Sequence, residues 1–323
     1  MKTMDYQNKS PLAIFLSYFK NHKGLFFVDM LCAMLIAAID LTFPLVTRSA
    51  LYDMLPNNLF GVFFTVMAAM LFCYLLRSFL NYIVCYFGHT FGIRVEADIR
   101  ADLFRHMQEL NYDFYDRNRT PLLMSRLTTD LFELTELAHH GPEDLVTSAL
   151  TIIGALTVMG VIQWRLALVV GLLIPVFLVV VLLMRKNMSR VSVGVKEKVA
   201  HINAEIESSL SGIRTAKAFA NEDLENARFN AANDVYKGSK RKFHKAMGLF
   251  SGSMEFLLTS LNVVVIGYGG YLVMTKQMDY RDLLTFTLYI TSFIAPMRKL
   301  ANFSELFANG FAGLNRFVAI MRT

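Results

Sequence analysis

Long runs of apolar residues constrain this chain more than any other feature of its sequence. The hydrocarbon core of a bilayer is about 30 Å thick, so a helix that crosses it needs about 20 mostly apolar residues. Several runs approach that length, and 54% of the 323 residues are hydrophobic. Only 18% are charged, against about 25% in an ordinary soluble domain. We therefore predict an all-α membrane protein that crosses the lipid bilayer several times.

The chain carries a formal net charge of +6. A basic balance can indicate nucleic-acid binding. In a membrane protein, however, Lys and Arg collect in the cytoplasmic loops. We favour this second explanation and expect no nucleic-acid partner.

Polar breaks divide the chain into an N-terminal helix and six spans. Ser10-Pro11 is a good helix start. The stretch Leu12–Lys20 that follows is too short to span and is rich in aromatic residues, so we expect an elbow helix in the membrane plane at about residues 11–22. The spans are expected at about residues 25–51, 60–110, 125–162, 165–210, 223–274 and 279–320.

Some of these helices are longer than a membrane is thick. A helix of about 50 residues from Phe60 would measure about 75 Å, so more than half of it must project into water. The projecting part keeps an apolar stripe made by Val95, Ile99, Leu103 and Met107. A second stripe comprises Val191, Val195, Val199, Ile202, Ile206 and Leu210. Such stripes are typical of helices that pack on other helices.

The long projections carry most of the basic residues. Residues 185–245 are dense in Lys and Arg, whereas the short turns at the other side of the spans hold few. The projections and both termini are therefore expected in the cytoplasm. The projecting helices form two long hairpins, one between the second and third spans and one between the fourth and fifth. Each hairpin turns at a short polar stretch, one near Asn111–Thr120 and the other at residues 212–222, GIRTAKAFANE.

Ionisable residues inside the apolar spans are candidates for a polar cavity. Such groups are costly at membrane depth and usually face a partner or a cavity. Asp40, Arg77 and Glu255 occupy such positions. Either Asp40 pairs with Arg77, or each group makes its own local contact. Thr291 and Ser292 are further candidates to line the cavity, although ordinary hydrogen bonding between helices is the more common role of such residues.

Motifs for catalysis or metal binding are not found in the sequence. There is no G-x-x-x-x-G-K-[ST], H-E-x-x-H or C-x-x-C pattern. His139-His140 is the one histidine pair, and adjacent side chains point about 100° apart on a helix. We interpret this pair as a solvated helix kink. No catalytic residue and no metal site are expected in this chain.

Four groups of residues resemble, in the right order, motifs of the membrane domain of ATP-binding cassette (ABC) exporters. The groups are Phe114-Tyr115-Asp116 with Thr120, Leu123, Ser125-Arg126-Leu127 and Asp130; Trp164, Leu166, Ala167, Leu168 and Pro175; Glu205, Gly212-Ile213-Arg214, Lys217-Ala218-Phe219 and Glu222; and Gly269-Gly270, Asp282-Leu283, Phe286 and Pro296. The resemblance covers nearly the whole chain. Pro121 and Leu122 depart from it, where the family usually has Gly and an acidic residue, and Arg281 stands where Gly is common.

The resemblance implies that the two hairpin tips are transverse coupling helices. In that family these helices seat in grooves of nucleotide-binding domains, which bind ATP and Mg²⁺. The implied residues of the first coupling helix are Phe114, Tyr115, Asp116, Arg117, Arg119 and Thr120. Those of the second are Gly212, Ile213, Arg214, Thr215, Lys217, Phe219 and Glu222. The resemblance also implies a dimer in which the second tip reaches the nucleotide-binding domain of the partner subunit.

The last residues, 313–323, resemble the segment that precedes the nucleotide-binding domain in the family. The ATPase domain is therefore expected on a longer form of the chain or on a separate subunit, and this chain alone is not expected to hydrolyse ATP. The function implied is the membrane half of an exporter in the cell membrane, in a homodimer or a heterodimer. By the same resemblance, its substrate pathway alternates between inward- and outward-facing when ATP binding and hydrolysis on the nucleotide-binding domains move the coupling helices. The sequence does not identify the exported substrate. The alternatives are an ATP-independent channel or secondary transporter, and a membrane scaffold that transports nothing.

Overall fold

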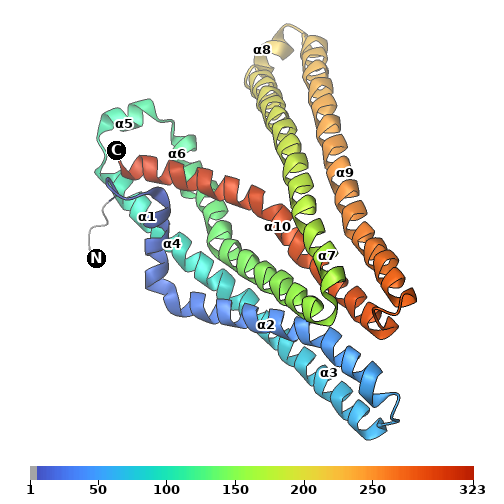
Figure 1. Cartoon of the computed structure of the whole chain (residues 1–323). Coiled ribbons are helices and arrows are strands. Elements are labelled where there is room, and N and C mark those ends of the chain that lie inside the picture. The colour runs from blue at the N-terminus through green and yellow to red at the C-terminus, as the bar shows by residue number, and fades with distance from the viewer. Residues whose placement is uncertain (1–5) are drawn as a thin grey trace. The chain divides into compact units, whose positions relative to one another are not determined.

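The computed structural model describes residues 6–323, and all of their regular structure is helical (Figure 1). The α-helices are α1 (Pro11–Phe19), α2 (Lys23–Ser49), α3 (Phe60–Ile83), α4 (His89–Glu109), α5 (Tyr112–Arg117), α6 (Thr120–Leu127), α7 (Thr129–Ser211), α8 (Ile213–Ala218), α9 (Glu222–Met274) and α10 (Tyr280–Met321). Three short segments have other helical types: the 3₁₀ turn η1 (Lys20–His22) and the π-helical turns η2 (Ala50–Met54) and η3 (Val84–Gly88).

The chain divides into two compact units. One consists of Met1–Val170 with Val264–Thr323, and the other of Gly171–Val263. Helices α7 and α9 each contribute residues to both. Within α7 the backbone leaves helical geometry at Gln163 (φ −152°, ψ 94°). This residue precedes Trp164, where a turn between two spans is predicted.

Four helical stretches among the described residues are long and apolar enough to cross a membrane. They are Pro11–Met54, Phe60–Glu109, Thr120–Ser211 and Glu222–Met274. Many of their large apolar side chains face outward; on α3, for example, Phe64, Leu71 and Phe72 are each about two-thirds exposed. Such apolar surface is stable against lipid or another apolar surface. The protein is therefore a multi-pass membrane protein, and the number of six crossings stays a prediction.

The first unit contains a core built on the predicted stripe of α4. Val95, Ile99, Leu103 and Met107 are all at most 4% exposed, which confirms the stripe. The surrounding core residues come from α1, α6, α7 and α10; they are Ile14, Phe15, Tyr18, Leu123, Leu131, Leu134, Ala138, Leu314, Phe317, Val318 and Met321. In this core the end of α10 packs against α1 and α4.

The N-terminal helix α1 begins as predicted but has a different environment. Ser10 Oγ accepts a hydrogen bond from the backbone N–H of Ala13, and Pro11 is the first helical residue. Phe15 and Tyr18 are at most 4% exposed because they pack into the core beside α4 and α10. The aromatic residues of α1 therefore serve protein packing, and the prediction that they face the membrane interface is wrong for these two.

The second unit is a pair of helical arms from α7 and α9, joined by the short helix α8 (Figure 1). The predicted stripe on α7 is partly buried at Val191 and Val195 and buried at Ile202. It becomes exposed near the tip, where Leu210 is 65% exposed. The stripe thus serves helix packing along most of its length, and its last residue is exposed at the tip.

Two details of the backbone were not predicted. The span expected to begin at about residue 125 is interrupted at Thr128 (φ −121°, ψ −83°), so α6 and α7 are separate helices. The long helix expected from Phe60 to Leu110 contains the π-helical turn η3, which separates α3 from α4. Turns of this kind insert a residue into a helix and often occur at functional sites.

Asp130 joins α6, α7 and α10 at the start of α7. The Arg316 guanidinium donates two hydrogen bonds to its carboxylate, both of 2.7 Å, and Arg126 donates a third of 2.7 Å. Asp130 is 7% exposed, and Gly313 lets α10 come close, because a Cβ there would lie 2.7 Å from the Asp130 carbonyl oxygen. These three charged hydrogen bonds offset the cost of burying the carboxylate.

We expect Asp130→Asn to lower the free energy of unfolding by about 2 kcal/mol at pH 7, because hydrogen bonds between charged groups are lost. Thermal unfolding in detergent should show a lower Tm for the variant than for the wild type. The exposed Asp113 gives the control variant Asp113→Asn, which should unfold close to the wild-type Tm. An equal loss of Tm in the two variants would contradict this role of Asp130.

Candidate functional site

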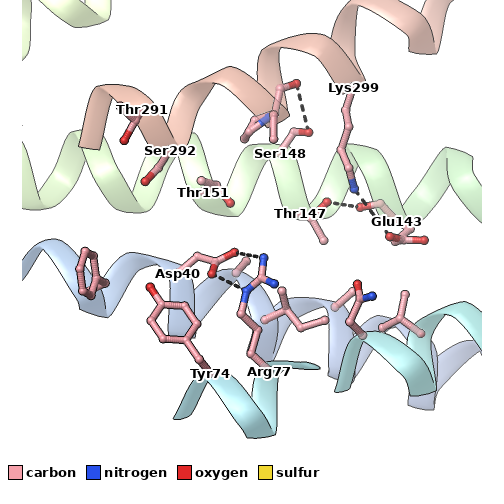
Figure 2. Close-up of a pocket in the computed structure, with 18 of the residues that line it drawn as sticks. Asp40, Tyr74, Arg77, Glu143, Thr147, Ser148, Thr151, Thr291, Ser292 and Lys299 are labelled. Atoms are coloured by element: carbon pink, nitrogen blue, oxygen red, sulfur yellow. Dashed lines mark hydrogen bonds and ion pairs between the residues drawn. The ribbon is translucent and has the colours of Figure 1, made fainter. Parts of the chain in front are cut away.

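A pocket of about 510 Å³ lies among α2, α3, α7 and α10 in the first unit (Figure 2). Its walls carry charged residues of both signs, hydroxyl groups and apolar side chains. The polar lining residues are Asp40, Tyr74, Arg77, Asn81, Glu143, Thr147, Ser148, Thr151, Thr291, Ser292 and Lys299. Four of the five cavity residues predicted from the sequence therefore lie around one pocket.

One wall is formed by α2 and α3, and it carries an ion pair between Asp40 and Arg77. Arg77 Nε donates to Asp40 Oδ1 at 2.6 Å, and Nη2 donates to Oδ2 at 2.9 Å. The two parallel hydrogen bonds fix both side chains, as is usual for a bidentate guanidinium–carboxylate pair. About a third of each side chain stays exposed. Of the two arrangements left open by the sequence, the structure has the ion pair.

The facing wall is formed by α7 and α10, and it carries hydroxyl groups (Figure 2). The hydroxyls of Thr291 and Ser292 both donate to the Leu288 carbonyl oxygen in their own helix. Ser148 donates across to the carbonyl oxygen of Pro296 at 3.5 Å. Since a hydroxyl that donates one hydrogen bond can still accept others, this wall can offer acceptor oxygens to a bound molecule.

A second ion-pair group closes one end of the pocket. Lys299 Nζ lies 2.7 Å from Asp144 Oδ1 and 3.7 Å from Glu143 Oε1. Glu143 and Lys299 both line the pocket, yet neither was singled out from the sequence. Both are followed or preceded by other charged residues in the sequence, which is the usual pattern of a solvent-exposed loop. They line the pocket only because α7 packs beside α10, and no local sequence pattern indicates that contact.

Glu255 is the cavity candidate that the pocket does not contain. It lies on α9 in the second unit, and its side chain is exposed. Sequence position alone could not separate it from Asp40 and Arg77, because all three are isolated charges in apolar stretches.

The histidine pair of α7 is not a solvated kink, and that interpretation was wrong. Helix α7 continues through His139 and His140, and His139 is 4% exposed. Its two ring nitrogens face carboxylates: Nδ1 lies 3.6 Å from Asp29 Oδ2, and Nε2 lies 3.7 Å from Glu143 Oε2. Since Glu143 also lines the pocket, this buried group adjoins it directly.

The first hairpin tip comprises α5, α6 and the residues between them. Asn111 begins α5 by accepting a hydrogen bond from the Phe114 backbone N–H, and Tyr115 donates its hydroxyl hydrogen bond to the Met107 carbonyl oxygen. Phe114 packs against the core of the first unit. The other predicted residues, Asp116, Arg117, Arg119 and Thr120, are more exposed or lie at the start of α6.

The second hairpin tip is α8, whose surface is open to solvent. Gly212 precedes the helix, and Ile213, Arg214, Thr215 and Lys217 on it are exposed. Phe219 ends it and is 73% exposed. Ala220 then takes a positive φ of 51°, and α9 begins at Glu222. Leu210 and Ile213, close to Phe219 in the chain, are exposed as well, so this tip carries several exposed apolar side chains.

Comparison with known proteins gives a consistent set of relatives. Residues 26–297 match the family model of the ABC transporter transmembrane region. The uncharacterized ABC transporter ATP-binding protein YwjA of Bacillus subtilis is 34% identical over 96% of this chain and 54% of its own length. An ATP-dependent lipid A-core flippase of Syntrophus aciditrophicus is 24% identical over 93% of this chain and 50% of its own.

A third relative, the ABC-type oligopeptide transporter ABCB9 of Mus musculus, is 29% identical over 61% of this chain and 26% of its own length. The chain thus spans about half the length of the first two relatives. The matched segment contains every lining residue of the pocket except Lys299, which lies just beyond it. The chain belongs to the family of ABC transporter transmembrane regions.

Proposed function

We propose that this chain is the membrane-spanning half of an ATP-driven exporter, and that its pocket binds the exported molecule. The observation that carries the proposal is the pocket among α2, α3, α7 and α10, which combines two ion-pair groups with hydroxyls inside an ABC transporter transmembrane region. Charged residues within membrane helices usually mark a path for a polar solute.

The lining of the pocket favours an amphipathic substrate. Asp40 and Arg77 present both signs of charge at one wall, and apolar residues such as Ile36, Phe43 and Leu288 complete the surface. A lipid or a drug with a charged group could place its polar end near the ion pair. The relatives' names include a lipid A-core flippase and an oligopeptide transporter, so the family allows different cargoes.

We further propose that the two hairpin tips transmit the work of ATP. The exposed Phe219 with Ile213 on α8, and the residues of α5, would dock on nucleotide-binding domains that hold ATP and Mg²⁺. The relatives named as an ATP-binding protein and as an ATP-dependent flippase are each about twice as long as this chain. Their additional length supports the presence of a partner ATPase domain. A second transmembrane half would complete the path and cover apolar surface such as that of α3.

This arrangement requires six crossings, with both termini and both tips in the cytoplasm of a cell that carries the protein in its plasma or inner membrane. The break at Gln163 supports two crossings within the helical stretch Thr120–Ser211. The dense Lys and Arg of residues 185–245 support a cytoplasmic position for the arms.

The first test concerns the ion pair. Asp40→Asn and Arg77→Gln should each reduce substrate-stimulated ATPase activity and transport of the complete transporter, because each leaves one charge without its partner. The double variant should lose less than the sum of the two, with a coupling of about 0.5–3 kcal/mol. Asp53→Asn, at an exposed position near the end of η2, is the control. Unchanged stimulation in both single variants would reject the proposed site.

The second test concerns the tip. Phe219→Asp should abolish transport and leave the protein folded and inserted, because a charge replaces the apolar docking side chain. ATPase activity in proteoliposomes should continue but no longer respond to substrate. Val193→Asp changes another exposed apolar residue, 55% exposed, which lies on α7 well before the tip in the chain, and serves as the control. Normal transport by the Phe219 variant would show that α8 does not dock in this way.

A further inference from the structure

Three buried side chains at the end of the pocket come from helices far apart in sequence. Asp29 of α2 is 1% exposed, His139 of α7 is 4% exposed, and Glu143, one turn later on α7, is 9% exposed. One ligand atom from each lies within 4.8 Å of the others. Carboxylate oxygen and imidazole nitrogen are ligands of first-row divalent metal ions.

Two atoms of this cluster face inward without a hydrogen bond. Within residues 6–323, Asp29 Oδ1 and His139 Nδ1 are both buried and have no hydrogen-bond partner. The 3.6 Å between His139 Nδ1 and Asp29 Oδ2 is too long for a hydrogen bond. Buried polar atoms are almost always satisfied, so two unsatisfied atoms in one small cluster call for a ligand.

The spacing fits a small cation. A tetrahedral ion with bonds of about 2.0–2.1 Å holds its ligand atoms roughly 3.3 Å apart. One imidazole binds an ion through only one of its two ring nitrogens. With one ligand atom from each residue, the three atoms lie within 4.8 Å of one another. Through Nδ1, His139 is 3.6 Å from Asp29 Oδ2, and Glu143 would have to turn toward the ion to complete the geometry. A further ligand is close at hand, because the His89 ring lies 4.6 Å and the His140 ring 4.4 Å from the His139 ring, measured between centroids.

The backbone beside the cluster is shaped around it. Gly88 ends the π-helical turn η3, and a Cβ at this position would lie 2.0 Å from His139 Cε1 and 2.8 Å from Asp29 Oδ1. Any other residue at position 88 would displace the imidazole or the carboxylate. The π-helical turn also leads directly into His89, whose Nδ1 is bonded to the Cys85 carbonyl oxygen. This hydrogen bond engages Nδ1 of His89 with the backbone of its own helical segment, so the other ring nitrogen, Nε2, points away from that backbone.

We propose that Asp29, His139 and Glu143 form a binding site for a first-row divalent transition-metal ion such as Zn²⁺. The ion would join α2 to α7 beside the pocket. It would also compete with Lys299 for Glu143, since Lys299 Nζ lies 3.7 Å from this carboxylate. Metal binding would thus change the charge presented at this end of the pocket, whatever molecule the pocket accepts.

The test uses the full-length protein in detergent, stripped with EDTA, free of nucleotide and carrying a purification tag without histidine. Titration with Co²⁺ should produce a visible absorption band that saturates at one ion per chain and that Zn²⁺ displaces. Asp29→Asn and His139→Gln should weaken Co²⁺ binding by more than about 100-fold, since even outer-shell changes cost 10–100-fold. His244→Gln, at an exposed histidine of α9, should bind as wild type does.

Two further measurements keep the proposal falsifiable if those variants fold poorly. Zn²⁺ should raise the Tm of the wild type, because a ligand of the folded state stabilises it. Lys299→Met should tighten Co²⁺ binding, because it removes the competitor for Glu143. Absence of the band in wild type would overturn the proposal. So would an equal band in the Asp29 and His139 variants, or stabilisation by acid alone, which would make His139 a protonated ion-pair partner.

Discussion

Charge pairing inside an apolar helical bundle is the constraint on which the first unit depends. Apolar surfaces give membrane helices little reason to prefer one neighbour to another, so polar contacts set much of their arrangement. Three ion pairs do so here: Arg77 with Asp40 joins α3 to α2, Lys299 with Asp144 joins α10 to α7, and Arg48 with Asp282 joins α2 to α10. Each pair satisfies two charges and fixes one contact between helices. The pocket lies among the helices that these pairs connect.

A similar arrangement organises the other end of the unit. Asp130 accepts hydrogen bonds from Arg126 on α6 and Arg316 on α10. These contacts lie beside the apolar core made by α1, α4, α6, α7 and α10. Because α10 carries Lys299 at the pocket and Arg316 at this core, one helix belongs to both contacts. Any movement of α10 along its axis would strain both. If the first hairpin tip docks as proposed, this connection would link it to the shape of the pocket.

Periodic features were predictable from the sequence because they depend on the helix alone. The stripe Val95 to Met107 follows the helical repeat and is buried as expected. Asp40 and Arg77 stood out because an isolated charge in an apolar run has few explanations. Asp29 and Glu143 did not, because charges are common where a span ends. His139 was noted as part of a histidine pair, but its burial between two carboxylates could not be read from the sequence. The π-helical turn η3 and the break at Thr128 have no clear sequence signal, and the pocket depends on contacts between α2, α7 and α10 that no local pattern encodes.

Export of a molecule bound in the pocket requires that the pocket open to one side of the membrane and then, when ATP binds, to the other. The most direct measurement places a single cysteine at Ser292, with Cys32, Cys73 and Cys85 replaced, in the complete transporter. Its reaction rate with a membrane-impermeant maleimide is then measured from each side, with and without a non-hydrolysable ATP analogue. We expect fast labelling from the cytoplasmic side without nucleotide and from the outer side with it. Labelling rates that nucleotide leaves unchanged on both sides would show that the pocket does not change sides.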